Sequence, residues 1–345
     1  MKQAIKAPFT KGVNFSYWME FKTADQINPD FFGKEDFENV KKLGGDVVRI
    51  PIHFEKICSE SENLAIPDKI FEILDRVAQW AEELKMYVIF DFHNATHIDS
   101  ATSAGVEDVL TPIWTQLSER YKDSTDYIIY ELMNEPHNID INLWNEIIVR
   151  VFKKVRNIDK KHYIVVGGAD WNSFEAMTKL PDFKDDKVIY TFHFYDPHTF
   201  THQGAPWCHM ERVVGIPFPY DPEKMPPLPD DPTEDEKRRF ESYPKQGTLE
   251  AVSGFFDRYV DFSLERNVPI FCGEFGCFIP HMPNDVRTNW YKIVTNLLAE
   301  RGISRTSWDY FGSFGIFELK GFGHRPVFPD ELNMDVVKAL GLFAD

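Results

Sequence analysis

The strongest constraint on the fold of this 345-residue chain is a regular alternation of short apolar runs with amphipathic helical patterns. The runs are rich in β-branched and aromatic residues, which favour strands, and the intervening segments repeat apolar residues at helical spacing. Strands that alternate with helices form parallel βαβ units. Eight strands are predicted, over residues 12–18, 47–52, 87–93, 127–134, 163–168, 188–195, 270–274 and 305–310.

Helical patterns fill the intervals between these strands. One begins at Pro67 and Asp68, and the others are expected over residues 34–43, 109–121, 143–157, 248–266, 285–301 and 334–343. Eight strand–helix alternations predict an α/β fold, a closed (β/α)8 TIM barrel that forms a single domain over residues 1–345. An open, doubly wound sheet is the alternative. It would normally carry a glycine-rich turn after the first strand, and residues 14–18 contain no glycine.

Residues 196–247 interrupt this rhythm. They show no clear periodicity and hold 10 of the 22 prolines. A linker here would cut the barrel between strands six and seven, so we predict a long proline-rich loop within the domain. Loops that follow barrel strands emerge at the carboxyl face, where active sites lie. We therefore expect this loop to wall a groove and to offer Trp207, Phe218 and Tyr220 for stacking on a ligand.

The charge balance and the apolar runs exclude several classes of partner. The formal net charge of −17 disfavours nucleic acid and anionic membranes, because both reward lysine and arginine. No apolar run reaches the roughly 18 residues of a membrane span. A neutral polymer is compatible with this charge, and we expect a monomer.

Four cysteines are too few for a disulfide scaffold, and we predict free thiols. The first ten residues lack the apolar stretch of a signal peptide. We therefore expect an extracellular protein if this is a mature form, and a cytoplasmic one otherwise.

Polar residues gather at the carboxyl ends of the predicted strands, where a core position would be costly but a site on the barrel face is natural. Two are glutamates at the ends of different strands, Glu135 in Met-Asn-Glu-Pro and Glu274 in Gly-Glu-Phe-Gly. A two-carboxylate hydrolase needs such a pair, because one acid protonates a leaving oxygen while the other attacks or activates water. The other strand ends carry Arg49, Asp91, His93, Asn94, Asn134, Thr191, His193, Tyr195 and Trp308.

On these residues the chain, from Gly12 to about Tyr310, resembles the family 5 glycoside hydrolases, which are retaining (β/α)8 enzymes with catalytic acids on strands four and seven. The family pattern is arginine, histidine, asparagine-glutamate, histidine-x-tyrosine, glutamate and tryptophan, in that order. This sequence fills every position, with Arg49, His93, Asn134, Glu135, His193, Tyr195, Glu274 and Trp308.

The resemblance implies a role for each of these residues. Glu135 would be the general acid and then the general base, and Glu274 the nucleophile, kept ionised by Arg49 and Tyr195. Asn134 would bind the sugar 2-hydroxyl, His93 and His193 would orient the sugar and tune the acids, and Trp308 would form the floor under the cleaved sugar. A retaining mechanism implies carboxyl groups about 5–5.5 Å apart. The resemblance also implies a cis peptide after Trp308.

Three further tryptophans are candidates for the groove. Trp171 directly follows strand five and is assigned to the groove, as is Trp207 in the proline-rich loop, while Trp18 is equally compatible with the core. No metal and no other cofactor is expected. The pairs His93–His97 and His198–His202 have the spacing of some metal ligands, but both fall in predicted loops, so this spacing does not place either pair on one helical face.

The expected activity is that of a retaining endo-β-1,4-glucanase, a cellulase that degrades a β-linked polysaccharide. The alternatives on the same scaffold are a β-mannanase, a xyloglucanase or a mixed-linkage glucanase, because all share the fold and the eight residues. A non-catalytic carbohydrate-binding barrel and a metal-dependent barrel hydrolase are the rivals from other classes. The two intact glutamates oppose the first, and the absence of His-x-His on strand one opposes the second.

Overall fold

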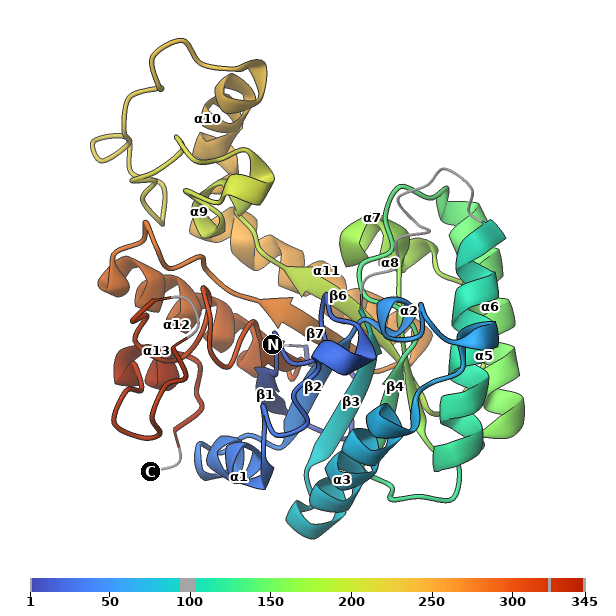
Figure 1. Ribbon diagram of the computed structural model, residues 1–345. Coiled ribbons are helices and arrows are strands. Elements are labelled where there is room, and N and C mark those ends of the chain that lie inside the picture. Colours follow the sequence, from blue (N-terminus) through green and yellow to red (C-terminus); the bar gives the residue numbers. More distant parts are fainter. Residues whose placement is uncertain (1, 94–103, 322–323, 344–345) are drawn as a thin grey trace.

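The structure, a computed structural model, describes residues 2–93, 104–321 and 324–343. Eight parallel strands close into a barrel in the order β1 to β8 (Figure 1). The predicted TIM barrel is therefore confirmed. The strands are β1 (Lys11–Asn14), β2 (Val47–Ile52), β3 (Tyr87–Phe92), β4 (Ile128–Glu131), β5 (Tyr163–Gly167), β6 (Val188–Phe194), β7 (Ile270–Phe275) and β8 (Ser304–Ser307).

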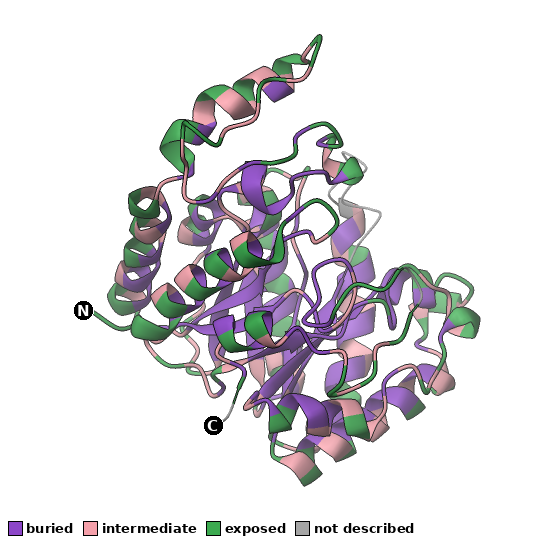
Figure 2. Ribbon diagram, turned by 90° about the vertical axis from the view of Figure 1, so that its left-hand side faces the viewer, coloured by how far each residue is buried: buried purple, intermediate pink, exposed green. Residues whose placement is uncertain are grey.

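Helices surround the barrel, with buried inner faces and exposed outer faces (Figure 2). The long ones are α3 (Asp68–Leu84), α5 (Ala104–Tyr121), α6 (Ile141–Ile158), α10 (Glu234–Gln246), α11 (Leu249–Arg266) and α12 (Asn284–Glu300). Shorter ones are α1 (Lys34–Lys42), α2 (Phe54–Ile57), α7 (Ala169–Asn172), α8 (Phe174–Lys179), α9 (His198–Thr201) and α13 (Met334–Ala339), with 3₁₀ turns η1 (Ala24–Gln26), η2 (Glu62–Leu64) and η3 (Pro206–Cys208). Among the described residues, no helix combines the length and the apolar character needed to cross a membrane.

Alternation along each strand divides the barrel into an inner and an outer surface, because successive side chains of a strand point to opposite faces. The inner surface begins with an apolar layer of fully or nearly fully buried side chains: Phe9, Val47, Ile89, Ile129, Val165, Ile189 and Phe271. Two residues further along three of these strands, the same face carries Arg49, Asp91 and Glu131. The apolar layer thus fills the bottom of the barrel and supports a charged layer directly above it.

The residues of opposite parity, such as Val48, Phe90 and Tyr130, belong to the main hydrophobic cluster together with the inner faces of the helices. This larger core covers the outside of the barrel. The strands are therefore buried on both faces, which explains why most of them read as nearly continuous apolar runs.

Several strands end earlier than predicted. β1 ends at Asn14, β4 at Glu131 and β8 at Ser307, although apolar or aromatic residues continue beyond each of them. The chain leaves the regular ladder there but stays tied to it. The backbone amide of Asn134 donates to Phe92 O at 2.8 Å, and that of Trp308 donates to Phe275 O at 3.0 Å. The residues just past the strand ends are thus held by single hydrogen bonds at the rim of the barrel.

The segment from 196 to 247 is not the irregular loop expected from its prolines, because it contains α9, η3 and the 13-residue helix α10. Only two residues of α10 are buried, so no apolar stripe marks this helix in the sequence. Its beginning does carry a signal. Thr233 and Glu236 form a reciprocal capping box, in which Glu236 accepts from the Thr233 amide at 2.8 Å. We call residues 206–247 the projection, since they rise above the barrel face (Figure 1).

Candidate active site

Arg49 organises the charged layer at the top of the barrel. Its side chain is fully buried, and its guanidinium donates to Glu131 at 2.7 and 3.0 Å, to Glu274 Oε1 at 2.8 Å and to Asn134 Oδ1 at 2.8 Å. It also lies 3.0 Å from Asp91 Oδ2. Since Asn134 Oδ1 is occupied by Arg49, the amide nitrogen of Asn134 is left to donate to a ligand.

Asn14, at the end of β1, closes this network on the side of β7 and β8. Its Oδ1 accepts from Arg49 at 2.9 Å. Its Nδ2 donates to Gly273 O at 3.0 Å and to Ser307 O at 3.1 Å. The arginine is therefore held by side chains from four strands and can keep one position while substrate enters.

Glu135 and Glu274 meet at the same imidazole. His193 Nδ1 lies 2.6 Å from Glu135 Oε1 and 3.6 Å from Glu274 Oε2. One carboxylate oxygen of each glutamate lies within 4.8 Å of the other. On the far side of the ring, Asn172 Nδ2 lies 3.4 Å from His193 Nε2. This contact directs the proton of a neutral His193 to Nδ1, between the two acids.

Tyr195 completes the surroundings of Glu274. Its hydroxyl donates to Glu274 Oε2 at 2.9 Å, so Arg49 and Tyr195 bind the two different oxygens of this carboxylate. Glu274 itself is almost fully buried, whereas the side chain of Glu135 is 25% exposed. Glu135 is therefore the more solvent-accessible acid, whereas Glu274 is fixed by hydrogen bonds from Arg49 and Tyr195.

A bulge in β7 brings Glu274 opposite His193. Phe192 pairs with Cys272 and His193 with Glu274, so Gly273 is an extra residue on β7. A Cβ atom at Gly273 would lie 3.0 Å from His193 Nε2 and 3.0 Å from Thr191 Oγ1. Only glycine leaves the imidazole where it is.

Replacing Gly273 with alanine is therefore expected to displace His193 by a few tenths of an ångström and to lower kcat/KM by about 10-fold, since a shift of roughly 1 Å in a positioning group can cost about 100-fold. Circular dichroism should show an intact fold. Gly254→Ala is the matched control, because it lies on α11 with open space around its Cβ direction, and it should leave activity unchanged. Equal activity of the two variants would show that the close approach at Gly273 is unimportant.

A second group of polar residues surrounds His93. Its Nδ1 lies 2.6 Å from Asp91 Oδ2, and its Nε2 lies 3.7 Å from Glu20 Oε1. Its ring is stacked on Trp308, with centroids 5.6 Å apart and an angle of 9° between the planes. His93 thus connects the charged layer to the indole, and the Trp308–Asp309 peptide is cis, as the family resemblance implied.

Burial dominates the electrostatics of these acids. It raises the pKa of Glu135, with His93 and Arg49 opposing the shift. It raises the pKa of Asp91 to about 8 and that of Glu20 to about 7. It lowers the pKa of His193 to about 4, so this imidazole is neutral near pH 7. A raised pKa keeps a carboxyl group protonated, which a proton donor requires.

Asp309, next to Trp308, allows the effect of burial on the pKa of a carboxyl group to be tested separately. Its Oδ2 accepts from the Ser16 hydroxyl, and burial raises its pKa to about 7. The unfolded chain loses this proton near pH 4, so the contribution of Asp309 to folding is greatest below pH 4 and is lost as the pH rises to about 7.

The free energy of unfolding of Asp309→Asn, relative to that of the wild type, should therefore rise by on the order of 2–3 kcal/mol between pH 5 and pH 8. The change is followed through the difference in thermal midpoint between the two proteins at each pH. The exposed Asp123, changed to asparagine, is the control and should follow the wild-type curve. Parallel curves for all three proteins would contradict the assignment.

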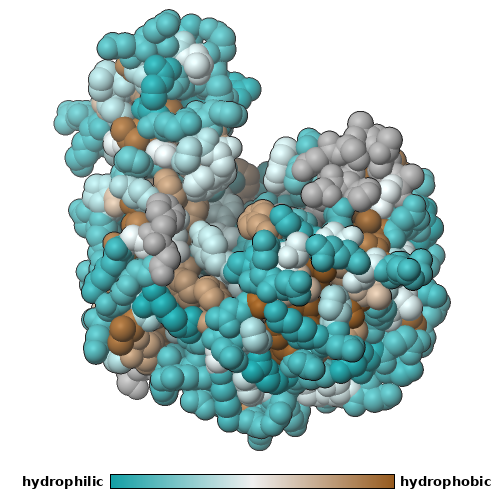
Figure 3. All heavy atoms as spheres, in the orientation of Figure 1, coloured by the Kyte–Doolittle hydropathy of each residue, from teal (hydrophilic) through white to brown (hydrophobic). Residues whose placement is uncertain are grey.

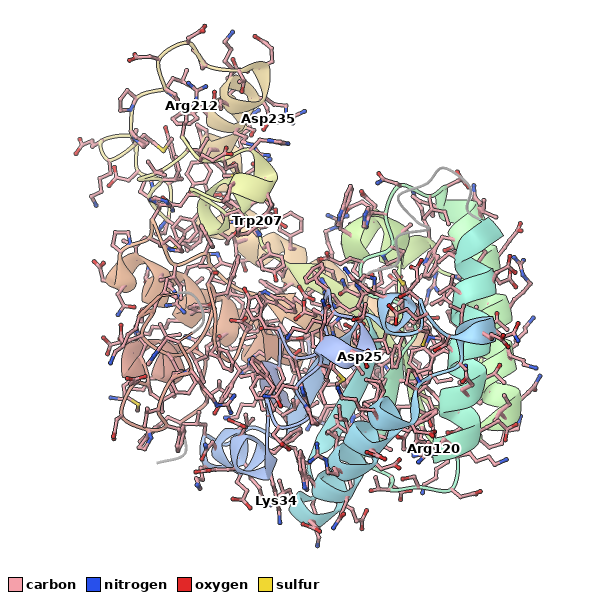
Figure 4. All side chains as sticks on the ribbon, viewed as in Figure 1. Asp25, Lys34, Arg120, Trp207, Arg212 and Asp235 are labelled. Carbon is pink, nitrogen blue, oxygen red and sulfur yellow. The ribbon has the colours of Figure 1, made fainter. Side chains whose placement is uncertain are left out.

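Two exposed tryptophans, in α7 and η3, are offered by different elements. Trp171 is 51% exposed, stacks on His137 at 4.9 Å, and donates its backbone N–H to Pro136 O, next to Glu135. Trp207 is 56% exposed and packs edge-on against Phe278 at 4.8 Å. Figure 4 shows Trp207 at the base of the projection, on the side towards α7. The surface is hollowed between the projection and the α7 side (Figure 3).

Two other aromatic residues are buried away from the groove, and a third is half-buried. Phe218 is buried against Phe200, so the expectation that it is offered to a ligand was wrong. Tyr220 is half-buried and packs on Tyr243, and its contact with a ligand stays a prediction. Trp18 is fully buried, and its indole N–H donates to Asn28 O, which makes it a core residue. Nothing in the sequence of such short aromatic-rich segments shows whether an aromatic side chain is buried in the core or exposed in the groove.

The structure thus brings together all eight residues that carry the resemblance, with Trp171 and Trp207 beside them. Asn94 and His97 lie outside the described residues. Sequence reasoning did not assign roles to Glu20, Asp91, Glu131 and Asn172. The alternation of faces could have revealed Asp91 and Glu131, because both lie two residues beyond a position of the inner apolar layer. All four cysteines are free thiols, as predicted.

Comparison with known proteins agrees with this geometry. The family described as Cellulase (glycosyl hydrolase family 5) matches residues 8–313. Endoglucanase 3 of Fibrobacter succinogenes is 28% identical over 332 residues, 89% of this chain but only 50% of that protein. Endoglucanase C of Acetivibrio thermocellus is 26% identical over 350 residues, 94% of this chain and 97% of that protein.

A solved structure of endoglucanase Cel5A from Thermotoga maritima has a TM-score of 0.78 at 26% identity, covering 96% of each chain. Structures of the same enzyme in complex with mannotriose and with cellobiose, both 25% identical, give TM-scores of 0.75 and 0.74. A match over most of the chain, joined to the barrel and to the complete set of strand-end residues, places this protein in glycoside hydrolase family 5.

Proposed function

We propose that this protein is a retaining, endo-acting β-glycosidase that hydrolyses β-1,4-linked glucan chains of the cellulose type. The observation that carries the proposal is the pair of glutamates at the ends of β4 and β7, with carboxylate oxygens within 4.8 Å of each other. A retaining enzyme needs its carboxyl groups about 5–5.5 Å apart, whereas an inverting one needs roughly 6.5–9.5 Å to hold a water molecule. The short separation supports double displacement.

In the first step Glu274 attacks the anomeric carbon and Glu135 gives its proton to the glycosidic oxygen as that bond breaks. The hydrogen bonds from Arg49 and Tyr195 hold the Glu274 carboxylate in the ionised form that attack requires. The raised pKa of Glu135 keeps its proton in place until the leaving oxygen needs it.

In the second step Glu135 takes a proton from water, the water oxygen attacks the anomeric carbon, and Glu274 leaves as a carboxylate. While Glu274 is bonded to the sugar it carries no charge. Glu135 then loses a negative neighbour, which lowers its pKa and suits it to act as a base. His193 lies within reach of both acids and stabilises whichever one is ionised through its Nδ1 proton.

Two other features favour a sugar chain as the substrate. The free amide nitrogen of Asn134 is placed to donate to a hydroxyl beside the reacting carbon, and the Trp308 indole offers an apolar plane for the C–H face of a sugar ring. The open hollow between the projection and the α7 side suits a chain that enters along its length, and this favours endo action (Figure 3). Trp171 belongs to α7, and Trp207 lies at the base of the projection (Figure 4).

Cellulose-type glucan is preferred because the relatives are endoglucanases and one solved relative binds cellobiose. A mannan is the second candidate, because the Thermotoga enzyme was also solved with mannotriose. Glucose and mannose differ in the configuration at carbon 2. The hydroxyl on this carbon is the one that the Asn134 amide is proposed to bind.

The test is an assay of reducing-sugar release from carboxymethyl cellulose, mixed-linkage β-glucan, xyloglucan and glucomannan or mannan, with NMR of the first product formed. The proposal predicts the highest kcat/KM on β-1,4-glucan, a rapid fall in viscosity and a β-anomer as the initial product. A preference for mannan would move the assignment to the second candidate, and an initial α-anomer would contradict retention.

Trp171→Ala and Trp207→Ala test whether the two indoles bind the chain. Each stacked ring is expected to contribute about 1–2 kcal/mol, so KM for long oligosaccharides should rise about 5- to 30-fold while small aryl glycosides remain nearly unaffected. Phe343→Ala is the control, since this aromatic residue is exposed at the far carboxyl terminus. Equal effects on long and short substrates would show that the indoles only support the fold.

A further inference from the structure

A cluster of three metal-ligating side chains lies behind the active site and takes no part in the proposed chemistry. His198, His202 and Cys208 each place one ligand atom within 4.8 Å of the other two. We call it the His198–His202–Cys208 cluster. The two histidines were expected in a loop, but α9 begins at His198, and the His202 amide closes its turn by donating to His198 O at 3.1 Å. Their i, i+4 spacing therefore does place both rings on the same side of one helical turn.

We propose that this cluster binds a divalent transition metal of the zinc class, and that Arg239 sets its affinity. Two imidazoles and one thiolate are ligands that zinc prefers, and water can supply the fourth position. Zinc bonds of 2.0–2.3 Å in a tetrahedron place donor atoms about 3.3–3.6 Å apart. His198 Nε2 and Cys208 Sγ are already 4.0 Å apart, so these two donors need to approach each other by less than about 1 Å.

His202 is oriented for this role by its neighbour. The Thr201 hydroxyl donates to Tyr195 O at 2.6 Å, so its oxygen is left to accept from His202 Nδ1, 3.0 Å away. The Nδ1 proton is thereby fixed, and Nε2 keeps a lone pair for a metal. A hydrogen bond of this kind on the other ring nitrogen is what metal-binding histidines normally have.

His198 is held in the opposite way. Arg239 Nη1 lies 3.3 Å from His198 Nδ1 and can only donate, so it favours the form of the ring that carries its proton on Nε2. A metal at Nε2 requires that proton to move to Nδ1, which Arg239 then repels. The guanidinium also adds a positive charge beside the ion, although Arg239 is partly neutralised by Asp235 at 2.6 Å. Arg239 therefore competes with the metal.

Two protons change place when the metal binds to the cluster. The Cys208 thiol releases its proton to solvent as the sulfur bonds to the metal, and the His198 proton is relocated from Nε2 to Nδ1. Access is direct, because Cys208 is only half-buried and the adjacent Trp207 is exposed. The cluster also contacts the active site, since the His202 ring packs edge-on against Tyr195 at 4.9 Å, and Tyr195 binds Glu274.

Cobalt titration of the intact protein tests the proposal, because a thiolate ligand gives Co²⁺ a near-ultraviolet charge-transfer band that carboxylates do not produce. We expect one Co²⁺ per chain with this band, displaced by Zn²⁺. Cys208→Ser should abolish the band, and His198→Gln should weaken binding at least about 10-fold. His209→Gln, an exposed histidine next to Cys208, should change nothing.

Arg239→Gln gives the sharpest outcome, because glutamine removes the charge and its amide oxygen can accept a hydrogen bond from His198 Nδ1–H. It should tighten Co²⁺ binding by about 10-fold or more, which a merely structural role of Arg239 would not produce. The proposal is overturned if the wild type shows no thiolate band, if the band persists in Cys208→Ser, or if Arg239→Gln binds no more tightly. Binding that is lost only in Glu135→Gln would assign the ion to the glutamate pair instead. Thermal melts without metal establish that each variant is folded.

Discussion

Replacing Glu274 with alanine is expected to lower kcat/KM on β-glucan by at least about 10⁴-fold, because Glu274 is the group proposed to form the glycosyl-enzyme bond. The variant should accumulate no covalent intermediate with a 2-fluoro glycoside, as followed by intact-protein mass spectrometry. Azide should restore turnover of activated aryl glycosides by occupying the vacated space, and the product should be a glycosyl azide of inverted configuration.

Glu135→Ala is the matched comparison, since the two acids have different tasks. Aryl glycosides with good leaving groups need little protonation, so their first step should be nearly unaffected, while substrates with poor leaving groups should lose about 10²- to 10⁴-fold. Azide should here give a product of retained configuration, because Glu274 still forms the intermediate. Identical behaviour of both variants towards azide and aryl glycosides would contradict the division of roles. Exposed Glu146→Ala serves as a neutral control.

Arg49→Gln is expected to be the most damaging change away from the two acids. It would leave Asp91, Glu131 and Glu274 in the barrel interior without the cation that each of them contacts within 3.0 Å. Removing one partner from a buried charge network costs about 3–5 kcal/mol, so the thermal midpoint should fall by on the order of 5–10 °C. Activity should fall further than stability explains, because Glu274 and Asn134 both lose their anchor.

The pH dependence of this loss is part of the prediction. Without Arg49 the pKa values of Asp91 and Glu131, already raised by burial, rise further, so these two groups are neutral at pH 5 and the deficit is smaller there than at pH 8. Arg258→Gln is the control, because its ion pair with Glu175 is exposed and contributes about 0–1 kcal/mol at most. A deficit in Arg49→Gln that is no larger than in Arg258→Gln, or is greater at pH 5, would refute the role of Arg49.

Much of the site could be predicted from the chain itself, because parallel strands deliver their carboxyl ends to one rim. Glu135 and Glu274 are distant in sequence, yet the order of strands alone implies that they share a face of the barrel. The same logic placed Arg49, His193 and Tyr195. Local chemistry was sufficient here, since each residue lies in or directly after an apolar run long enough to identify it as a strand.

Burial of aromatic residues was not predictable in the same way. The sequence around Trp18 and Phe218 gives no sign that separates them from Trp171 and Trp207, yet the first two side chains are buried and the last two are exposed. The choice depends on which distant element meets each ring. Helix α10 was missed for a related reason, since its charged surface touches little of the core and leaves no apolar period.

The sequence by itself determined the barrel, the order of its strands and the residues at its rim, because hydrophobic periodicity and strand-end polarity are local properties. Only the tertiary structure decided which groups meet. It placed Asp91 and Glu131 around Arg49, turned Asn172 towards His193, used the Gly273 bulge to set Glu274 opposite that histidine, and brought Cys208 to His198 and His202. These contacts join residues on different elements, so they follow from strand register and helix packing, which no short segment of the chain encodes.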